Sequence, residues 1–180
     1  MVKKAFPLSV AIASSLLVVA EAATFCNGGN ENVAVQSTTP SVDFQLNDNG
    51  TAIHVPEGLM WMRCSLGQTW DRVESQCKGT ATTINWNDAV ARAENTTFAG
   101  YSDWRLPDKS ELATIVELRC WSPVINVHVF PNTPSAWYWS STPYPFSRTD
   151  AWGVYFGLGS LGGASGDGYL PRVRLVRDAR

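Results

Sequence analysis

Aromatic and charged side chains alternate in and around two late segments of the chain, residues 143–150 and 157–169. Aromatic rings can stack on the faces of sugar rings, while guanidinium and carboxylate groups can bind hydroxyl, sulfate or carboxylate groups. Because loops vary freely on a rigid scaffold, we expect these segments to form a ligand-binding surface. The expected ligand-binding residues are Tyr144, Phe146, Arg148, Asp150, Trp152, Asp167, Tyr169 and Arg172.

The chain contains eight tryptophans, more than a core of this size normally needs, and this excess favours a binding function. The alternative is that the rings hold a loop-rich fold together. Some residues lie at helix entrances, where the capping turn and the apolar face need support. The residues expected to be structural for this reason are Trp86, Trp104, Arg105 and Leu106.

Residues typical of enzymes and metal sites are sparse. His54 and His128 stand apart, and the sequence has no Gly-x-Ser-x-Gly, phosphate-loop or His-Glu-x-x-His motif. A carboxylate pair such as Asp150 and Asp167 is the chemistry of a glycoside hydrolase, but spacing alone does not support that interpretation. We therefore expect a non-catalytic protein without a metal or cofactor. A hydrolase is the third interpretation.

The first residues have the pattern of a secretory signal peptide. Lys3 and Lys4 precede an apolar stretch, and Ala20-Glu21-Ala22 fits a cleavage site, so we expect residues 1–22 to be removed. The apolar stretch is about 16 residues long, shorter than the ~20 that span a bilayer. We expect a secreted, periplasmic or cell-surface protein with no membrane span after cleavage.

The net charge argues against a nucleic-acid partner. The whole chain carries −2, and cleavage would remove two lysines and one glutamate to leave −3. Four arginines nevertheless gather near the carboxyl end, at Arg172, Arg174, Arg177 and Arg180. We expect a terminal strand on which exposed arginines alternate with other residues. A local anion-binding strip is the alternative.

The four cysteines all lie in the exported part, which favours disulfides over a metal site. No two of them have the two-to-four-residue spacing of a zinc site. Cys64 and Cys77 enclose 12 residues rich in polar and turn-forming types, a loop that lacks its own core and benefits from a covalent link. We therefore expect a Cys64–Cys77 pair, which leaves Cys26 to pair with Cys120.

The first half of the chain has turn, strand and helix signals in succession. Residues 23–43 are rich in Asn, Gly, Ser and Thr, so we expect a flexible N-terminal arm ahead of a domain over residues 44–180. Asn47-Asp48-Asn49-Gly50 is typical of a hairpin turn and favours that turn over a calcium loop. Strands are expected at 51–55 and 58–62.

Two helices and several late strands follow. Asn85 with Asp88, and Asp108 with Glu111, have the spacing of helix N-terminal capping pairs. Apolar residues recur with helical periodicity after each cap. The expected late strands are 137–142, 151–156 and 172–176, and the glycine- and serine-rich segment 157–168 is expected to be a loop.

Several ordered motifs resemble the bacterial Lcl C-terminal domain family, and together they span nearly the whole chain after residue 44. They include Gly58-Leu59-Met60-Trp61, residues 63–70, Trp86-Asn87-Asp88-Ala89, residues 100–112, residues 130–134, residues 138–142, Ala151-Trp152 and residues 173–177. The resemblance implies an α+β, C-type-lectin-like fold, in which two helices pack on a small, mostly antiparallel sheet with long loops.

The resemblance also implies functions. The family's named member is a collagen-like adhesin whose terminal domain binds sulfated polysaccharides and forms a trimer. This chain has no Gly-X-Y repeats, so homo-oligomerisation stays open. Trp86-Asn87-Asp88 coincides with a calcium motif of sugar-binding C-type lectins, but it opens a predicted helix and lacks its companion triplet. We therefore expect no calcium-dependent sugar binding.

Two functional interpretations remain. The first is an exported adhesive module whose partner is a glycan or cell-surface polysaccharide. The second is a structural or protein-interaction domain whose partner is an envelope protein, for example in a pilus-like assembly.

Overall fold

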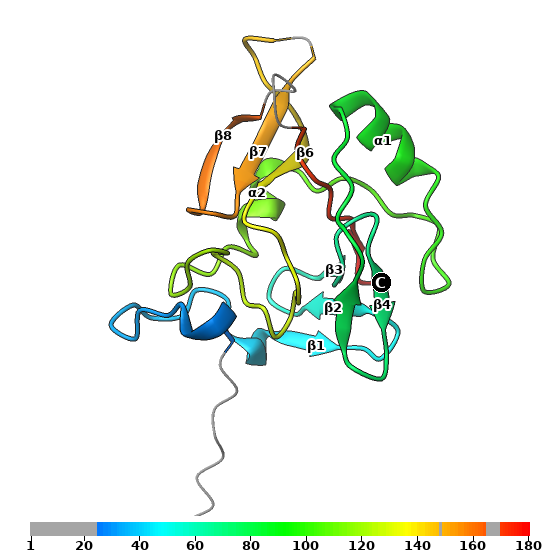
Figure 1. Cartoon of the computed structure of the whole chain (residues 1–180). Coiled ribbons are helices and arrows are strands. Elements are labelled where there is room, and N and C mark those ends of the chain that lie inside the picture. The colour runs from blue at the N-terminus through cyan, green and yellow to red at the C-terminus, as the bar shows by residue number, and fades with distance from the viewer. Residues whose placement is uncertain (1–24, 148, 165–169) are drawn as a thin grey trace, which may run out of the picture.

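The computed structural model describes residues 25–147, 149–164 and 170–180. The expected signal peptide and the predicted ligand-binding residues Arg148, Asp167 and Tyr169 lie outside these residues. The described chain contains three separate antiparallel sheets and two α-helices (Figure 1).

The first sheet joins the beginning of the domain to its carboxyl end. Its strand order is β1 (Phe44–Leu46), β2 (Thr51–His54), β3 (Leu59–Met62) and β9 (Val176–Asp178), and every neighbouring pair is antiparallel. The Asn-Asp-Asn-Gly segment makes the tight turn between β1 and β2, as predicted. The Asn47 amide closes that turn by donating to the Thr51 carbonyl over 2.9 Å.

The second sheet contains β6 (Trp137–Pro143), β7 (Ala151–Tyr155) and β8 (Ser160–Ala164), in that order. Figure 1 shows it at the far end of the molecule from β1. The prediction of a loop over residues 157–168 was wrong for β8. Glycines disfavour strands in general, but here Gly162 and Gly163 lie opposite β7 where neighbouring rings leave no room for a side chain.

The third sheet is the hairpin of β4 (Thr69–Asp71) and β5 (Gln76–Lys78). The Cys64–Cys77 disulfide ties its base to the end of β3, which confirms the predicted pairing. The hairpin lies along one side of the molecule and reaches the β1–β2 turn, where Trp70 Nε1 donates to the Asp48 carbonyl over 2.8 Å (Figure 1).

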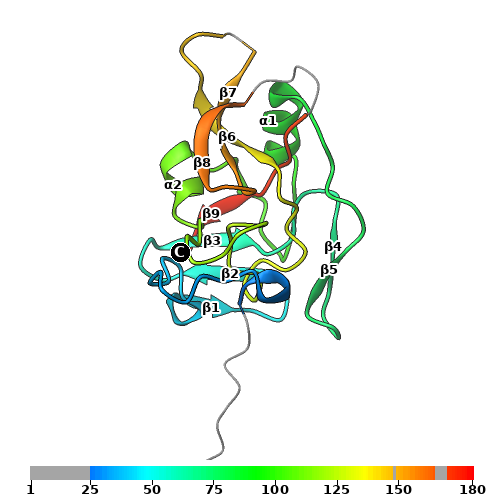
Figure 2. The ribbon, with the colours of Figure 1, turned by 60° about the vertical axis from the view of Figure 1, so that its left-hand side comes forward.

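Both predicted helices are present. Helix α1 (Trp86–Glu94) begins after Asn85, whose side chain accepts from the Asp88 amide over 2.9 Å. Helix α2 (Lys109–Ala113) begins after Asp108 with a complete capping box, in which Asp108 accepts from the Glu111 amide and Glu111 accepts from the Asp108 amide. Both helices pack against the β6–β7–β8 sheet side of the molecule (Figure 2).

Two apolar clusters form the core. One lies between the four-stranded sheet, the segment after α2 and the inner side of β6 and β7, and it includes Trp61, Ile115, Phe130, Tyr138 and Val154. The other packs α1 and the segment before α2 against β3, β6 and the chain that leads into β9, with Trp104 and Trp139 as its largest members. Ile115 follows the end of α2 yet is fully buried, so the predicted apolar stripe extends beyond the end of the helix.

The prediction of a terminal strand with exposed, alternating arginines was wrong. The regular strand begins only at Val176, and Arg174 and Arg177 are 0% and 6% exposed. The Arg174 guanidinium donates to the Met62 carbonyl over 2.9 Å and to Thr133 Oγ1 over 2.7 Å. Because the chain passes between the two main sheets here, residues on both of its sides are covered.

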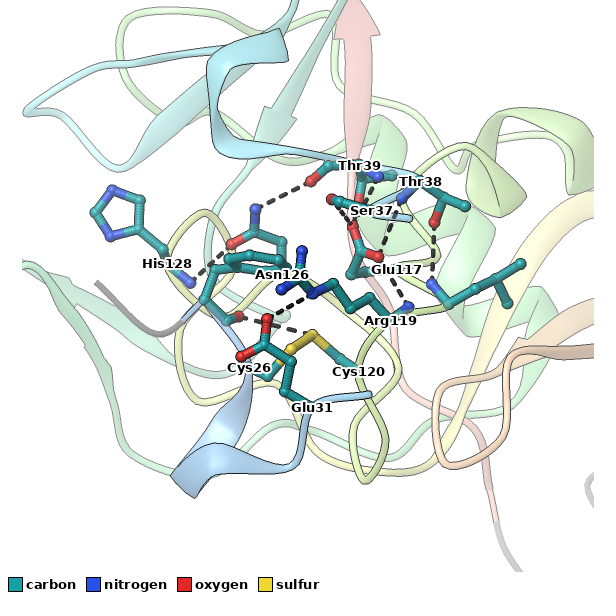
Figure 3. Close-up of a disulfide and its surroundings, with 12 residues drawn as sticks. Cys26, Glu31, Ser37, Thr38, Thr39, Glu117, Arg119, Cys120, Asn126 and His128 are labelled. Atoms are coloured by element: carbon teal, nitrogen blue, oxygen red, sulfur yellow. Dashed lines mark hydrogen bonds and ion pairs between the residues drawn. A yellow bond between two sulfur atoms is a disulfide. The ribbon is translucent and has the colours of Figure 1, made fainter. Parts of the chain in front are cut away.

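The segment before β1 is fastened at several points. Its Cys26 pairs with Cys120, which confirms the second predicted disulfide (Figure 3). The fully buried Glu117 carboxylate accepts from the Ser37 hydroxyl over 2.6 Å and from the Thr39 amide over 2.7 Å. Burial alone would raise the pKa of the Glu117 carboxyl, but these hydrogen bonds outweigh burial and hold it below its usual value. The domain boundary at residue 44 stays a prediction.

The architecture is therefore α+β with mostly antiparallel strands, as predicted, but it has three small sheets where a single sheet was expected. Within the described residues, no helix has the length and apolar character needed to cross a membrane.

Candidate functional site

An aromatic cleft of about 360 Å³ opens beside the β6–β7–β8 sheet, between β6, β7 and the chain that leads into β9. Trp137 and Tyr155 line it together with Arg172, and their two rings lie 5.5 Å apart at an angle of 33°. All three side chains are partly exposed. The cleft therefore combines a flat aromatic surface with a guanidinium group, which suits a ring-shaped ligand with polar substituents.

Strand register places the two rings together. Trp137 of β6 is the direct cross-strand partner of Tyr155 of β7, so their side chains leave the same face of the sheet. Gly162 on β8 lies below the indole, and a methyl group there would come within 3.0 Å of the Trp137 ring. The absence of a side chain at Gly162 thus leaves room for Trp137 to lie against the sheet.

Hydrogen bonds to β6 hold the main chain of Arg172, and its side chain lines the cleft. Its amide donates to the Trp137 carbonyl over 2.8 Å, and its carbonyl accepts from the Trp139 amide over 2.9 Å. Its buried Nε atom has no hydrogen-bond partner among the described residues. The main chain of Arg172 is therefore fixed beside β6, and its partly exposed side chain lines the cleft.

A second aromatic cluster forms around the loop between β6 and β7. The Tyr144 ring lies 5.2 Å from the Trp152 ring and 5.6 Å from the Phe146 ring, edge to face in both pairs. Lys109 Nζ lies 4.6 Å from the centre of the Trp152 ring. Phe146 is 85% exposed, so this cluster ends in an apolar side chain that projects into solvent.

A glycine supports this cluster as well. Gly163 pairs with Trp152 across β7 and β8, and a methyl group at Gly163 would come within 2.7 Å of the Tyr144 ring. Tyr144 therefore lies flat over β8 only because position 163 has no side chain. Its amide donates to the Asp150 carbonyl over 3.1 Å, which closes the loop.

The structure divides the predicted ligand-binding residues into two groups. Tyr144, Phe146 and Trp152 come together, with Asp150 beside them, whereas Arg172 lies in the cleft. Trp152 and Tyr155 are three positions apart on the regular strand β7, so they project to opposite faces of the sheet. The two groups are consequently separate surfaces.

Sequence reasoning missed Trp137 and Tyr155 in the cleft and Lys109 in the loop cluster. Both aromatic residues lay in predicted strands, and the available signal was that each starts or ends a strand next to a turn. Their pairing was not readable from spacing, because β6 shifts register between Trp139 and Pro143.

The residues predicted to be structural at the helix entrances have that role in the geometry. Trp104 is 2% and Leu106 is 4% exposed. Arg105 forms a two-pronged ion pair with Glu111, at 2.7 and 2.8 Å, which steadies the capping box of α2. Trp86 is only partly buried, and its Nε1 donates to the Ser140 carbonyl over 2.9 Å.

The two histidines lie in different surroundings. His54 is buried and stacks on Phe44 with the ring centres 4.4 Å apart, and burial lowers the pKa of its imidazole. His128 is exposed, and its backbone amide donates to Asn126 (Figure 3). Among the described residues, no three His, Cys, Asp or Glu side chains gather closely enough to hold a metal ion.

Comparison with known protein families matches residues 50–177 to the Lcl C-terminal domain. The chain belongs to this family. The match includes both helices, the β6–β7–β8 sheet and all of the cleft residues named above, but it begins after β1. Comparisons with curated proteins and with solved structures return no match.

Membership of the Lcl C-terminal domain family indicates a bacterial adhesin-like domain that binds surface molecules. The two disulfides are compatible with an extracellular location, because such bonds persist in oxidising compartments.

Proposed function

We propose that this protein is an exported, non-catalytic adhesive module that recognises carbohydrate in the cleft of Trp137, Tyr155 and Arg172. The observation that carries the proposal is the paired, partly exposed Trp137 and Tyr155 rings with a guanidinium beside them. Aromatic faces stack on the apolar faces of sugar rings. Trp137 and Tyr155 are partly exposed, unlike the buried rings of the core.

Arg172 gives the cleft a preference for anionic sugars. A guanidinium binds sulfate or carboxylate through paired, charge-assisted hydrogen bonds, and the Arg172 side chain is partly exposed where it lines the cleft. The chain's overall charge is negative, so attraction to a polyanion must come from this local group. Binding should therefore weaken as salt increases, because exposed charges are screened within ~8 Å at physiological ionic strength.

Removal of residues 1–22 as a signal peptide is part of the same proposal, because an adhesive module must reach the outside of the cell. The C-type-lectin-like fold implied by the family resemblance would place binding on variable loops and strand ends of a rigid scaffold.

A structural or protein-interaction domain of a cell-envelope assembly is the second candidate. The exposed Phe146 at the end of the Tyr144–Trp152 cluster favours it, since a projecting aromatic side chain suits a pocket on a protein partner.

The test is retention of the mature protein on heparin and fucoidan resins across a salt series, with and without EDTA. We expect salt-sensitive retention that EDTA leaves unchanged. Trp137→Ala and Arg172→Gln should abolish or strongly weaken it, while Phe146→Ala serves as the matched aromatic control and should behave as wild type. Full retention of folded Trp137→Ala and Arg172→Gln would remove the cleft from consideration.

A further inference from the structure

A second hollow, of about 490 Å³, lies where the β1–β2 turn, the β4–β5 hairpin and the loop before Trp104 meet. None of the residues that line it belongs to the β6–β7–β8 sheet. Its floor is apolar and consists of Ile53 and Met60, which are direct cross-strand partners on β2 and β3. Figure 1 shows the β4–β5 hairpin beside the end of β1, where the Arg72–Asp48 ion pair of 2.9 Å joins the two.

One wall of this hollow is the ring of Tyr101, and the protein holds it firmly. Tyr101 and Phe98 exchange two backbone hydrogen bonds of 2.9 and 3.0 Å around a tight turn. The Arg177 guanidinium lies 4.0 Å from the centre of the Tyr101 ring and is itself fixed by Asp103 through bonds of 2.7 and 3.0 Å. A ring held in this way needs little ordering when a ligand contacts it.

The rim opposite Tyr101 is polar and carries no unbalanced charge. Asn47 donates its amide group to the Thr51 hydroxyl, and the Asn49 side-chain oxygen accepts from Thr51. These bonds use one end of each amide, and within the described residues the other ends have no protein partner. Asp48 and Arg72 balance each other at 2.9 Å.

We propose that this hollow binds a neutral, polyhydroxylated ring, such as one uncharged hexose unit of a glycan. An apolar floor and an aromatic wall fit the C–H face of a sugar ring, while free amide groups can donate to and accept from its hydroxyls. The balanced rim gives no preference for an anion. The site is separate from the Trp137 cleft, so one molecule could hold two glycan segments of different chemistry.

The test is a titration of ¹⁵N-labelled mature protein with maltotetraose, cellotetraose and mannotetraose, followed by amide chemical shifts. At least one oligosaccharide should move the signals of residues 47–49, 72 and 101, and the affinity should not change with salt. Tyr101→Leu keeps an apolar group under Arg177 but removes the flat ring. It should weaken binding by about tenfold, which corresponds to ~1.4 kcal/mol. Tyr101→Phe should bind as wild type.

The variant Trp137→Ala separates this proposal from the proposed function, since it should retain neutral-sugar binding while losing retention on sulfated resins. Three results would overturn the second site: no shifts with any of the three oligosaccharides, unchanged affinity in folded Tyr101→Leu, or shifts confined to β6 and β7.

Discussion

Arg172 and Arg174 are two residues apart, yet their surroundings have almost nothing in common. Arg174 is fully buried, donates to main-chain carbonyls and hydroxyls, and lies 4.7 Å from the centre of the Phe130 ring. Arg172 is partly exposed at the cleft, and its Nε has no partner among the described residues. One arginine joins the parts of the core, and the other lines the cleft.

The tryptophans show the same contrast between buried and partly exposed side chains. Trp61 and Trp104 lie in the core and are 0% and 2% exposed. Trp137 and Trp152 lie on opposite faces of the β6–β7–β8 sheet and are partly exposed. Residue type alone therefore does not predict which tryptophans of this domain are buried.

Loss of the Cys26–Cys120 disulfide should lower the stability of the folded protein more than any other change predicted here. This bond spans 94 residues, so replacing both cysteines by serine should lower the free energy of unfolding by about 4.5 kcal/mol in the chain-entropy model. The same change at Cys64 and Cys77, which are 13 residues apart, should cost about 3 kcal/mol. Urea unfolding of the oxidised proteins measures both. A larger loss at Cys64–Cys77 would contradict this ranking.

The sequence could predict these two bonds because loop composition and cysteine number leave few sensible pairings. It could also predict both helices, since the Asp108–Glu111 pair marks a helix start locally. The cleft was less accessible. Trp137 meets Tyr155 only through the register of β6 against β7, and that register shifts within β6. Burial of Arg174 depends on two sheets distant in sequence, so local alternation gave the wrong answer for it.

Replacing a buried and an exposed tryptophan by alanine tests the comparison directly. Trp104→Ala should lower the free energy of unfolding by about 4 kcal/mol, because it removes a fully packed ring from the core. Trp137→Ala should cost about 1 kcal/mol and act mainly on glycan retention. Thermal or urea unfolding gives the first quantity, and resin retention gives the second. Equal destabilisation by the two changes would contradict the distinction between the buried and the partly exposed tryptophan.

The arginine pair offers a second test with smaller effects. Arg174→Met should lower the free energy of unfolding by about 3 kcal/mol, because several buried acceptors lose their donor at once and each costs ~1–3 kcal/mol. Burial and the nearby charge of Arg174 also lower the pKa of Arg63 to about 10, which reflects how little water reaches this part of the core. Arg172→Met should leave unfolding nearly unchanged while reducing retention on sulfated resins. Urea unfolding and resin retention of both variants provide the comparison.

Glu117 should make the stability of the folded protein depend on pH. Its pKa is lower in the folded protein than its ordinary value of 4.5, so the unfolded chain binds more protons in acid. The stability that Glu117 contributes is present above about pH 4.5 and is lost as the pH falls through the folded pKa. Glu117→Gln should cost about 2 kcal/mol at neutral pH, where it removes hydrogen bonds to a charged acceptor, and should flatten the acid limb.

Unfolding free energies measured from pH 7 down to acid, for wild type and Glu117→Gln, check this prediction. The two curves should converge as the pH falls. Parallel curves would show that Glu117 is not the group that links the segment before β1 to acid stability.

Phe146→Ser should have the smallest effect on stability and the greatest value for separating the two surfaces. The side chain is 85% exposed, so its loss should change the free energy of unfolding by no more than about 0.5 kcal/mol. If the cleft of Trp137, Tyr155 and Arg172 binds the glycan, retention on sulfated resins should stay at the wild-type level. If the loop over residues 143–150 forms the ligand surface instead, retention should fall in Phe146→Ser and in Tyr144→Ala, although both proteins remain folded.

Pull-down from envelope extracts with the same variants addresses the remaining possibility, because a protein partner that docks on the loop should be lost while glycan retention persists. The result that would break the comparison is loss of glycan retention in Phe146→Ser together with full retention in Arg172→Gln, since the exposed loop would then do what the sheet cleft is proposed to do.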